Sequence, residues 1–286
     1  AKLTLAHYDR SAAQAIVATA IDEIERLERV FSLHRANSDL SILNRDGHIK
    51  TPAADLINLL SSSSRFGDLT DGAFDVTVQP LWRLFSDHFS KQPGTQTGPS
   101  DADIRSTLSL VDYRKIDITP GRVRFAKPGM AITLNGIAQG YITDRVADLL
   151  RDQGISQVLV ELGETRALDD HPDGRPWRIG LADPEDPKQT TETVELINES
   201  VATSAGSGTV FGGDGRYHHL FDPRSGEPAK QHISASVITK RATTADAMST
   251  ALFVLPTSQI EGIVQKIGGM KAVTTLPGGI KHRFVS

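Results

Sequence analysis

Helical segments and short β-rich runs alternate along the whole chain, and this alternation limits the folds that the chain can adopt. Residues 11–30, SAAQAIVATAIDEIERLERV, place their apolar side chains three and four positions apart, which predicts a helix with one buried face. The glycine-containing turns GGDG (212–215) and DPRSG (222–226) lie among β-rich runs and favour antiparallel hairpins. We therefore predict an α+β fold with interspersed helices and largely antiparallel strands.

The same patterns predict where the elements lie. Helices are predicted at residues 11–30, 52–67, 101–111, 135–154, 244–255 and 257–268. Strands are predicted at residues 115–118, 122–125, 157–162 and 177–182, and in the later runs SVATSAG (200–206), GTVF (208–211), RYHHLF (216–221), SASVIT (234–239) and KAVTTL (271–276). Residues 90–100, SKQPGTQTGPS, are predicted to form an exposed loop and not a domain linker, so a single domain is expected over residues 1–286.

Composition excludes several classes of partner and site. The formal net charge is −4 and the basic residues are scattered, so we expect no nucleic-acid partner. No stretch approaches the roughly 18 consecutive apolar residues that a membrane helix needs, so no direct membrane span is expected. The chain has no cysteine, which excludes disulfides, thiolate metal sites and a cysteine nucleophile. Any metal must therefore be held by oxygen or nitrogen.

The stretch TTADAMSTALFVL (243–255) carries an aspartate in an otherwise apolar helix. Asp246 and Thr250 are four residues apart, so their side chains lie on one face of the helix and can point at one ligand. A local explanation is also available, because Thr243 or Thr244 suits an N-cap and an aspartate in the first turn suits the helix dipole. From the helix alone, local capping is the favoured explanation.

Three other stretches contain residues that could belong to a functional site. Their sequence patterns are also compatible with a structural role. In RYHHLF, strand alternation would separate His218 from His219, so that one faces inward; such a histidine is more often a structural group than a catalytic base. TLNGIAQGY (133–141) predicts a glycine turn before a helix, without a P-loop or dinucleotide fingerprint. DGAFD (71–75) fits an ordinary turn before a helix or strand.

Six segments, taken together and in this order, resemble the ApbE-like flavin transferases, also called FAD:protein FMN transferases. They are FSLHRANSDLSILN (31–44), DGAFD (71–75), TLNGIAQGY (133–141), VELGETRALDD (160–170), HHLFDPRSGEP (218–228) and ADAMSTALFVL (245–255). The resemblance covers most of the chain and implies the ApbE-like architecture, which is related to the T-fold.

The resemblance implies a magnesium site and an FAD site. Mg²⁺ would be bound by Asp246, Thr250 and a backbone carbonyl that falls on Gly136, which fits the preference of Mg²⁺ for oxygen ligands. His219 would be a general base or would organise the phosphate. The residues implied to line the FAD site are Ala73, Phe74, Asp75, Thr133, Gln139 and His219.

Three positions depart from the family pattern. Thr133 stands where the family usually has aspartate, and Gln139 stands where it usually has lysine, so two charged FAD contacts become neutral. His34 stands where an aromatic tyrosine or tryptophan often stacks on the flavin. We expect these changes to leave the metal ligands intact and to alter how FAD is held.

The implied reaction moves FMN from FAD to a threonine or serine hydroxyl of an acceptor protein and releases AMP. The implied acceptor is a flavoprotein subunit of a membrane electron-transfer complex of the Nqr, Rnf or NosR kind, with the motif Asp-x-x-(Ser/Thr)-Gly-Ala-(Ser/Thr). The absence of cysteine and a start without Met fit an exported chain, so we expect a periplasmic location with the signal or lipoprotein segment removed. Two alternatives are a Mg²⁺-dependent FAD pyrophosphatase and a non-enzymatic FAD-binding or trafficking protein.

Overall fold

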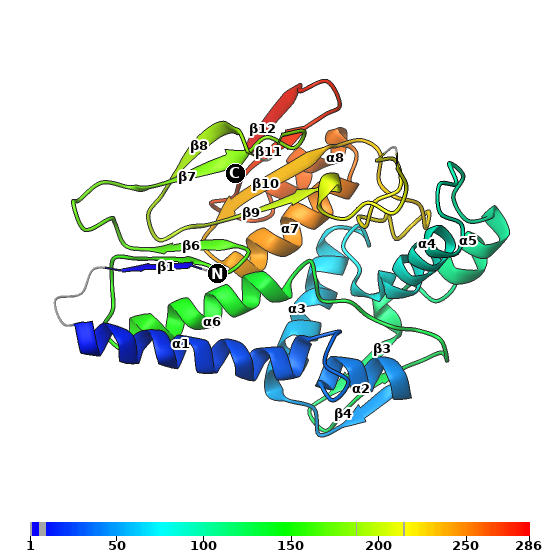
Figure 1. The fold of residues 1–286 in the computed structure, drawn as a ribbon, viewed down its shortest axis with the longest axis horizontal. Helices are drawn as coiled ribbons and strands as arrows, with labels where there is room; N and C mark the ends of the chain where they lie inside the picture. Colours follow the sequence, from blue (N-terminus) through cyan, green and yellow to red (C-terminus); the bar gives the residue numbers. More distant parts are fainter. Residues whose placement is uncertain (1, 6–9, 187, 214) are drawn as a thin grey trace.

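The largest sheet has seven strands, and each neighbouring pair runs antiparallel (Figure 1). The computed structural model describes residues 2–5, 10–186, 188–213 and 215–286. In spatial order the strands are β1 (Lys2–Leu5), β5 (Val158–Glu161), β6 (Thr165–Leu168), β9 (Ser200–Ala205), β10 (Ser234–Thr239), β11 (Lys271–Thr275) and β12 (Lys281–Val285). The predicted antiparallel arrangement is therefore confirmed.

Two smaller sheets stand apart from the large one. The first consists, in spatial order, of β2 (His48–Lys50), β4 (Arg122–Phe125) and β3 (Ile116–Thr119). The second is a two-stranded ribbon of β7 (Trp177–Ala182) and β8 (Thr190–Leu196). The turn after β7 reaches the candidate site described below.

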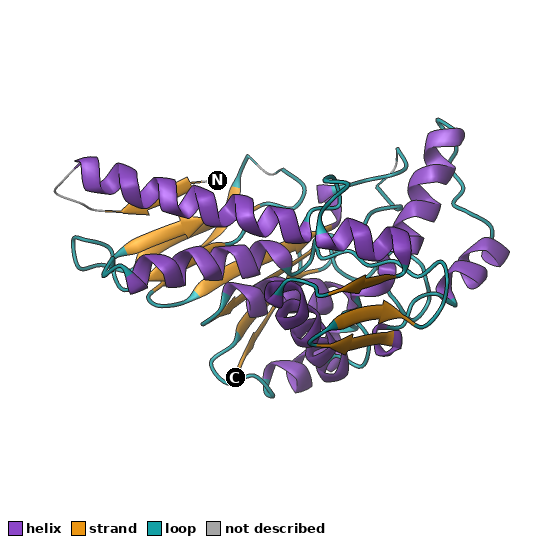
Figure 2. Ribbon diagram, turned by 90° about the horizontal axis from the view of Figure 1, so that it is seen from below, coloured by secondary structure: helices purple, strands orange, loops and turns teal. Residues whose placement is uncertain are grey.

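Helices cover the large sheet and extend beyond it. They are α1 (Arg10–Phe31), α2 (Asp39–Asp46), α3 (Ala54–Leu69), α4 (Gln79–Lys91), α5 (Asp101–Leu108), α6 (Ala138–Asp152), α7 (Ala242–Val254) and α8 (Thr257–Val264). Figure 2 shows α1 and α6 lying side by side in front of the large sheet, and α6 packs on β5 and β6. No helix of the described residues is long and apolar enough to span a bilayer.

Helix α7 lies at the centre of the largest apolar core. It packs against β9 and β10 and also against α6. Ten of its thirteen residues are buried, which explains why apolar residues occur around its whole circumference. A carboxylate in such a helix requires polar partners, because burying an unpaired charge is costly. Asp246 is this carboxylate.

The N-terminal halves of α6 and α7 bind each other through reciprocal hydrogen bonds. Asp144 of α6 accepts hydrogen bonds from the amides of Ala242 (3.0 Å) and Thr243 (2.9 Å), which begin α7. Asp246 of α7 accepts a hydrogen bond from the amide of Gly140 (2.9 Å), which lies in the first turn of α6. Each helix therefore supplies a carboxylate that satisfies free amides of the other.

The predicted threonine N-cap of α7 was wrong. The helix begins at Ala242, so Thr243 and Thr244 lie inside it and Asp246 lies in its second turn. Its first two amides are bound by Asp144, so the chain needs no local cap there. Local capping of α7 consequently does not explain Asp246.

The predicted strands GTVF and RYHHLF were also wrong. This part of the chain forms isolated bridges, between Val210 and His218 and between Phe221 and Pro228. The segment is rich in glycine, which weakens strands. The DPRSG turn is confirmed, with Gly226 at φ +78° and its amide bound to the carbonyl of Asp222 (2.8 Å). The GGDG turn includes residue 214, which lies outside the described residues.

The other predicted helices and strands are present, with shifted ends. The helices predicted to reach residues 111 and 268 end at Leu108 and Val264. The predicted loop at 90–100 is confirmed after the end of α4. The sequence patterns did not predict α2, β1, β2, β6, β8 and β12. For the segment that forms α4, they did not distinguish a helix from a strand.

Candidate active site

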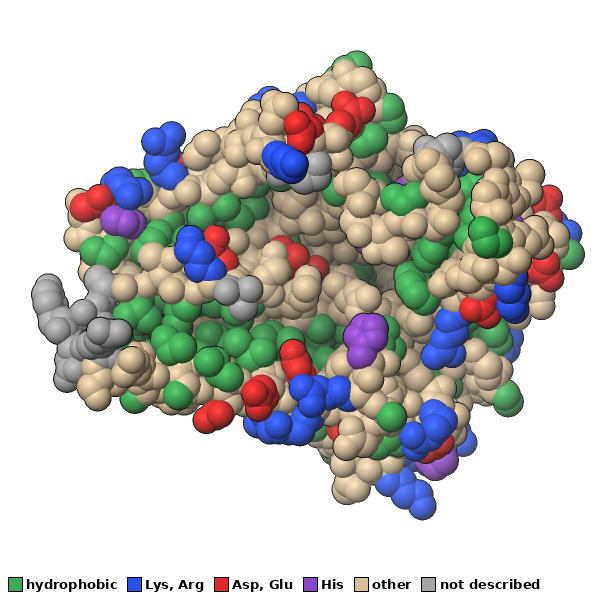
Figure 3. Space-filling model, in the orientation of Figure 1, with side chains coloured by type: hydrophobic (Ala, Val, Ile, Leu, Met, Phe, Trp, Pro, Cys, Tyr) green, Lys and Arg blue, Asp and Glu red, His purple; other side chains and the backbone are tan. Residues whose placement is uncertain are grey.

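A cavity of about 820 Å³ opens where α4, α7, the turn before α6 and the loop after β9 meet. The space-filling view shows a hollow near the middle of one face, with acidic side chains inside it (Figure 3). The cavity is lined by all ten residues predicted for the site: His34, Ala73, Phe74, Asp75, Thr133, Gly136, Gln139, His219, Asp246 and Thr250. The structure therefore gathers into one place residues that are spread over more than two hundred positions of the sequence.

Two carboxyl groups lie at one end of this cavity, the buried Asp246 and the half-buried Glu164. Asp246 is only 4% exposed, and burial raises its pKa well above the ordinary range of an aspartate. Burial also raises the pKa of Glu164, and the nearby charge of Asp246 raises it further. Two neighbouring carboxylates that are both desolvated favour binding of either protons or a cation. This end of the cavity is therefore suited to a positive ion.

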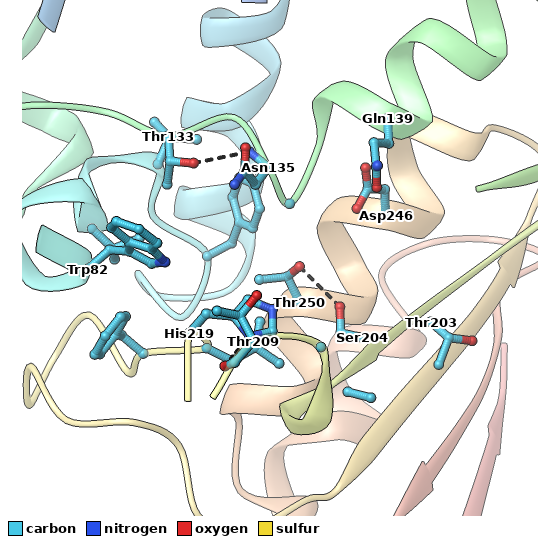
Figure 4. A pocket seen from close by; sticks show the side chains of 18 of the residues that line it. Trp82, Thr133, Asn135, Gln139, Thr203, Ser204, Thr209, His219, Asp246 and Thr250 are labelled. Atoms are coloured by element: carbon cyan, nitrogen blue, oxygen red, sulfur yellow. Dashed lines mark hydrogen bonds between the residues drawn. The ribbon is translucent and has the colours of Figure 1, made fainter. Parts of the chain in front are cut away.

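A chain of hydroxyl groups orients Thr250. The hydroxyl of Ser249 donates to the carbonyl of Asp246 (2.9 Å), so its oxygen is free to accept. Ser204 of β9 lies 2.8 Å from Ser249 and 3.2 Å from Thr250, oxygen to oxygen (Figure 4). In the order that satisfies all these contacts, Thr250 donates to Ser204 and Ser204 donates to Ser249. The lone pairs of Thr250 then remain available to a ligand in the cavity.

Two glycines allow the turn before α6 to approach α7. A Cβ at Gly136 would lie 2.8 Å from the hydroxyl oxygen of Thr250, so any other residue would force Thr250 or the turn to shift. A Cβ at Gly140 would overlap the carbonyl oxygen of Ala242 and lie 2.8 Å from the Cβ of Asp246. The spacing of Gly136 and Gly140 thus brings backbone against both predicted metal-binding side chains.

The residues at this end fit Mg²⁺. One carboxylate oxygen of Asp246 binds Gly140, and the other accepts no hydrogen bond from the described residues. Thr250 offers lone pairs, and the backbone of Gly136 lies against that hydroxyl. Among the described residues no group of three or more His, Cys, Asp or Glu side chains could hold a metal. A mixed set of carboxylate, hydroxyl and carbonyl oxygens is nevertheless what a hard cation binds, with phosphate or water completing the shell.

His219 presents an unprotonated nitrogen to the cavity. Its Nδ1 lies 3.2 Å from the carbonyl oxygen of Thr209, and a carbonyl can only accept a hydrogen bond. The proton of the neutral ring is therefore on Nδ1, which leaves Nε2 with a free lone pair. Burial lowers the pKa of His219 and so favours this neutral form. A neutral imidazole with this nitrogen free is able to accept a proton.

His218 has a structural environment instead. It is 7% exposed, its Nε2 donates to the carbonyl of Ala229 (2.9 Å), and its Nδ1 accepts from the amide of Leu220 (3.3 Å). Burial lowers its pKa to about 4, so it is neutral at physiological pH. Both ring nitrogens are used, and His218 packs edge-on against Phe253. The expectation that only one of the two histidines faces the core is confirmed, and that histidine is His218.

Comparison with known proteins connects this geometry to a family. The family model of the ApbE family matches residues 1–274. The chain belongs to the ApbE family. Relatives named FAD:protein FMN transferase include one from Vibrio cholerae, 32% identical over 244 residues that cover 83% of this chain and 72% of the relative. Another, from Haemophilus influenzae, is 30% identical over 272 residues that cover 88% of this chain and 78% of the relative.

Solved structures agree with this membership. The flavinyl transferase ApbE of Pseudomonas stutzeri, in its apo form, superimposes with a TM-score of 0.80 at 29% identity and covers 95% of this chain and 87% of that chain. The ApbE protein of Thermotoga maritima superimposes with a TM-score of 0.85 at 29% identity and covers 99% of this chain and 92% of that chain. The expected ApbE-like architecture is therefore confirmed.

Two of the departures in this ApbE-family chain lie at the start of α6: Thr133 is in the turn before the helix, and Gln139 is in its first turn. The hydroxyl of Thr133 accepts a hydrogen bond from the amide of Asn135 (3.2 Å), and the Thr133 amide binds the carbonyl of Val76 (2.8 Å). The side chain of Gln139 packs against Gly163, so close that a Cβ there would lie 2.8 Å from its amide carbon. Neither position carries a charge. Of the lysine and arginine residues in the described part of the chain, only Arg83 lines the cavity.

Asp75 and His34 both line the cavity, but Asp75 is bonded to the protein backbone and His34 is exposed to solvent. One carboxylate oxygen of Asp75 accepts from the amide of Thr77 (2.7 Å) and the other from the amide of Tyr113 (3.0 Å), so Asp75 holds the loop that borders the cavity. Burial raises the pKa of Asp75. His34 is exposed at the rim.

Several cavity residues were not predicted from sequence. Asn135 and Glu164 lie inside the segments 133–141 and 160–170, so those segments located them without indicating their orientation. Ser204 lies in a predicted strand, where alternation places every second side chain on the α7 side. The sequence pattern did not indicate that Trp82 would line the cavity, because the pattern around it did not distinguish a helix from a strand.

Proposed function

We propose that this protein transfers FMN from FAD to a threonine or serine hydroxyl of an acceptor protein, in the presence of Mg²⁺, and releases AMP. The observation that carries the proposal is the convergence of Asp246, Thr250 and the free Nε2 of His219 on one cavity. That cavity combines oxygen ligands for a cation with a neutral base. The names of the relatives support FAD as donor and a protein as acceptor.

The residues that would hold Mg²⁺ are Asp246, Thr250 and the backbone carbonyl of Gly136. When bound, Mg²⁺ would neutralise pyrophosphate charge and polarise the phosphorus–oxygen bond that is to break. The half-buried Glu164 lies beside this group and adds negative charge to it. Because Gln139 is neutral, no side chain at that position competes with the cation for the two carboxylates.

The chain's own base acts on the acceptor. Nε2 of His219 accepts the proton of the acceptor hydroxyl while that oxygen forms a bond to the FMN phosphorus. The bond from this phosphorus to the bridging oxygen breaks, and the oxygen leaves with AMP. The hydrogen bond from Nδ1 of His219 to Thr209 fixes the tautomer and stabilises the imidazolium that forms.

The test compares transfer with hydrolysis. The protein is incubated with FAD, Mg²⁺ and an acceptor that carries the motif Asp-x-x-(Ser/Thr)-Gly-Ala-(Ser/Thr). We expect covalently bound FMN on the last hydroxyl residue of the motif and AMP in equal amount. Replacing that hydroxyl residue with alanine, or chelating the metal, should stop both products. AMP release that continues at full rate without the hydroxyl would show a pyrophosphatase, and unchanged FAD would show a binding or trafficking protein.

A matched variant tests the metal site. Asp246→Asn keeps an oxygen that can accept from Gly140 and keeps the core volume, so the fold should be retained. The variant should lose turnover and also the rise in melting temperature that Mg²⁺ gives the wild type. A variant with an unchanged Mg²⁺ response would contradict the assignment of Asp246 as a ligand.

The acceptor and the cellular location extend the proposal. The acceptor would be a flavoprotein subunit of a membrane electron-transfer complex of the Nqr, Rnf or NosR kind, and the enzyme would act in the periplasm. Mass spectrometry of flavinylated proteins in cells that express or lack this chain would identify the acceptor, and fractionation would locate the enzyme.

A further inference from the structure

Trp82 offers the cavity an aromatic surface. Three Phe, Tyr or Trp residues line the cavity in the described part of the chain, namely Phe74, Trp82 and Phe221. Phe74 is 3% exposed and Phe221 is 4% exposed, so both are already covered by protein. Trp82 is half-buried. A flat ligand that enters the cavity therefore finds in Trp82 a ring that still has surface to cover.

A cluster of aromatic side chains holds the indole in place. Phe211 meets the Trp82 ring edge-on, with ring centroids 5.7 Å apart and the planes at 74°. Phe211 is itself packed against Phe85 and Phe221, with centroids 6.3 Å and 6.2 Å away. The indole is thus supported from the protein side, and a supported ring loses little conformational freedom when a ligand stacks on it.

Trp82 lies away from the acidic end of the cavity. Figure 4 shows Trp82 well separated from Asp246 and Gln139, with Thr250 and His219 between them. A dinucleotide whose pyrophosphate lies near Thr250 and His219 would extend one ring system toward Trp82.

The chemistry of this end favours the flavin over the adenine. Val78 lies one helical turn before Trp82, on the same face, and also lines the cavity. Leu33 is another half-buried apolar residue that lines the cavity. An electron-rich indole pairs well with the electron-poor isoalloxazine, whose large dimethyl-substituted edge needs apolar cover. The polar lining groups include Gln79 and Arg83 on the same helix as Trp82, and Thr203, Ser204 and Asp183 on other elements.

We propose that Trp82 stacks on the isoalloxazine ring of FAD and so orients the FMN half of the donor. The inference rests on the proposed function, because that function makes FAD the donor. Trp82 would determine specificity: it would favour flavin dinucleotides over dinucleotides that lack a large planar second ring. Stacking would also keep the FMN in the cavity while the acceptor hydroxyl approaches.

The test measures FMN binding without metal or acceptor, so that turnover does not enter. Indole in contact with a flavin quenches its fluorescence by electron transfer, whereas a phenyl ring does not. Wild-type protein should therefore bind FMN in a dark form. Trp82→Leu should raise the Kd for FMN about tenfold, the value of one stacking contact, and leave the Kd for AMP unchanged. Trp82→Phe should keep the FMN Kd within about threefold while bound FMN becomes bright.

The chain provides a matched control, because its second tryptophan, Trp177, is a buried residue of β7 and does not line the cavity. Trp177→Phe should leave bound FMN dark. Bright FMN bound to the wild type, or bound FMN that stays dark in Trp82→Phe, would overturn the proposal even if Trp82→Leu fails to fold. A weaker AMP affinity with unchanged FMN affinity would assign adenine to this end instead. Wild-type protein that binds neither FMN nor FAD would contradict the proposed function itself.

Discussion

His218 and His219 are neighbours in the chain, yet their surroundings assign them different roles. We predict that His219→Asn lowers transferase turnover about 10² to 10⁴-fold, the usual contribution of a general base, and leaves FAD affinity nearly unchanged. Asparagine can still donate to the carbonyl of Thr209 but lacks Nε2, so the variant removes the base and keeps the local contact. Single-turnover kinetics and equilibrium FAD binding separate the two effects.

His218 supplies the control. Because His218 is buried and both of its nitrogens are bonded, His218→Ala should destabilise the protein by about 1–3 kcal/mol and leave single-turnover chemistry of the folded fraction intact. If His219→Asn weakened FAD binding and preserved the chemical rate, His219 would be a binding residue.

A substitution at Gln139 tests how the absence of a positive charge at this position affects the binding of FAD and Mg²⁺. We predict that Gln139→Lys tightens metal-free FAD binding, because its ammonium group would lie near the buried carboxylates and the pyrophosphate. The same ammonium group should weaken Mg²⁺ binding, since it competes with the cation for Asp246 and Glu164. Calorimetric titrations with FAD and with Mg²⁺ measure both effects, and Gln139→Met is the uncharged control. A clear loss of FAD affinity in the lysine variant alone would mean that this chain holds FAD in another pose.

At the scale of the elements, the packing of α6 on α7 depends on Gly140. Alanine favours a helix interior by about 1 kcal/mol over glycine, yet we predict that Gly140→Ala lowers the melting temperature. Its methyl group would overlap the carbonyl of Ala242 and press on Asp246. Gly262→Ala in α8 is the control, because a Cβ there meets nothing within 4 Å, and it should raise stability by about 0.5–1 kcal/mol. Equal effects of the two substitutions would show that α6 can move away from α7 at no cost.

The reciprocal capping gives a second prediction at this scale. Asp144 is fully buried and binds the guanidinium of Arg166 (2.8 Å) as well as the first amides of α7. Asp144→Asn should cost about 3 kcal/mol or more of stability, because it leaves a buried arginine partly unpaired. Asp148→Asn, at a half-exposed partner of the same arginine, should cost about 1 kcal/mol or less. Urea denaturation measures both, and a similar loss for the two would contradict the capping role.

The sequence predicted those elements whose local pattern agrees with their burial. Residues 122–125 alternate in pattern and in the structure form β4 with alternating burial, and the apolar stripe of 11–30 becomes α1. The local patterns did not predict the structure correctly where contacts between distant parts of the chain determine it. Asp144, about a hundred residues away, determines where α7 begins, and the glycine-rich chain around His218 is held by isolated bridges and not by a regular ladder.

Over the whole molecule, the site joins segments that are distant in sequence. The family resemblance predicted which residues would line it, because the motifs occur in order along the chain. It did not indicate that Ser204 orients Thr250, or that Trp82 faces the far end of the cavity. These depend on which face of β9 meets α7 and on how α4 packs, and neither is encoded in a short motif.

The stability of the whole protein should depend on pH in opposite ways with and without metal. Burial raises the pKa values of Asp246 and Glu164, so the folded metal-free protein keeps protons that the unfolded chain releases above about pH 4. Stability therefore falls as pH rises above that value. The lowered pKa values of His218 and His219 act in the other sense, because their contribution is lost as pH falls below about 6.5.

Mg²⁺ should reverse the carboxylate effect. Metal binding requires the ionised carboxylates, so the stabilisation that a fixed Mg²⁺ concentration gives should grow as pH rises. We predict that the difference in melting temperature between Mg²⁺ and EDTA increases steadily from pH 5 to pH 9, as measured by calorimetry. Asp246→Asn isolates the cause, because it leaves both histidines in place but removes one of the two carboxylates. In EDTA this variant should lose less stability than the wild type as pH rises, and Mg²⁺ should no longer raise its melting temperature at any pH. A wild-type response to Mg²⁺ that is the same at pH 5 and pH 9 would mean that the cation does not bind at Asp246 and Glu164.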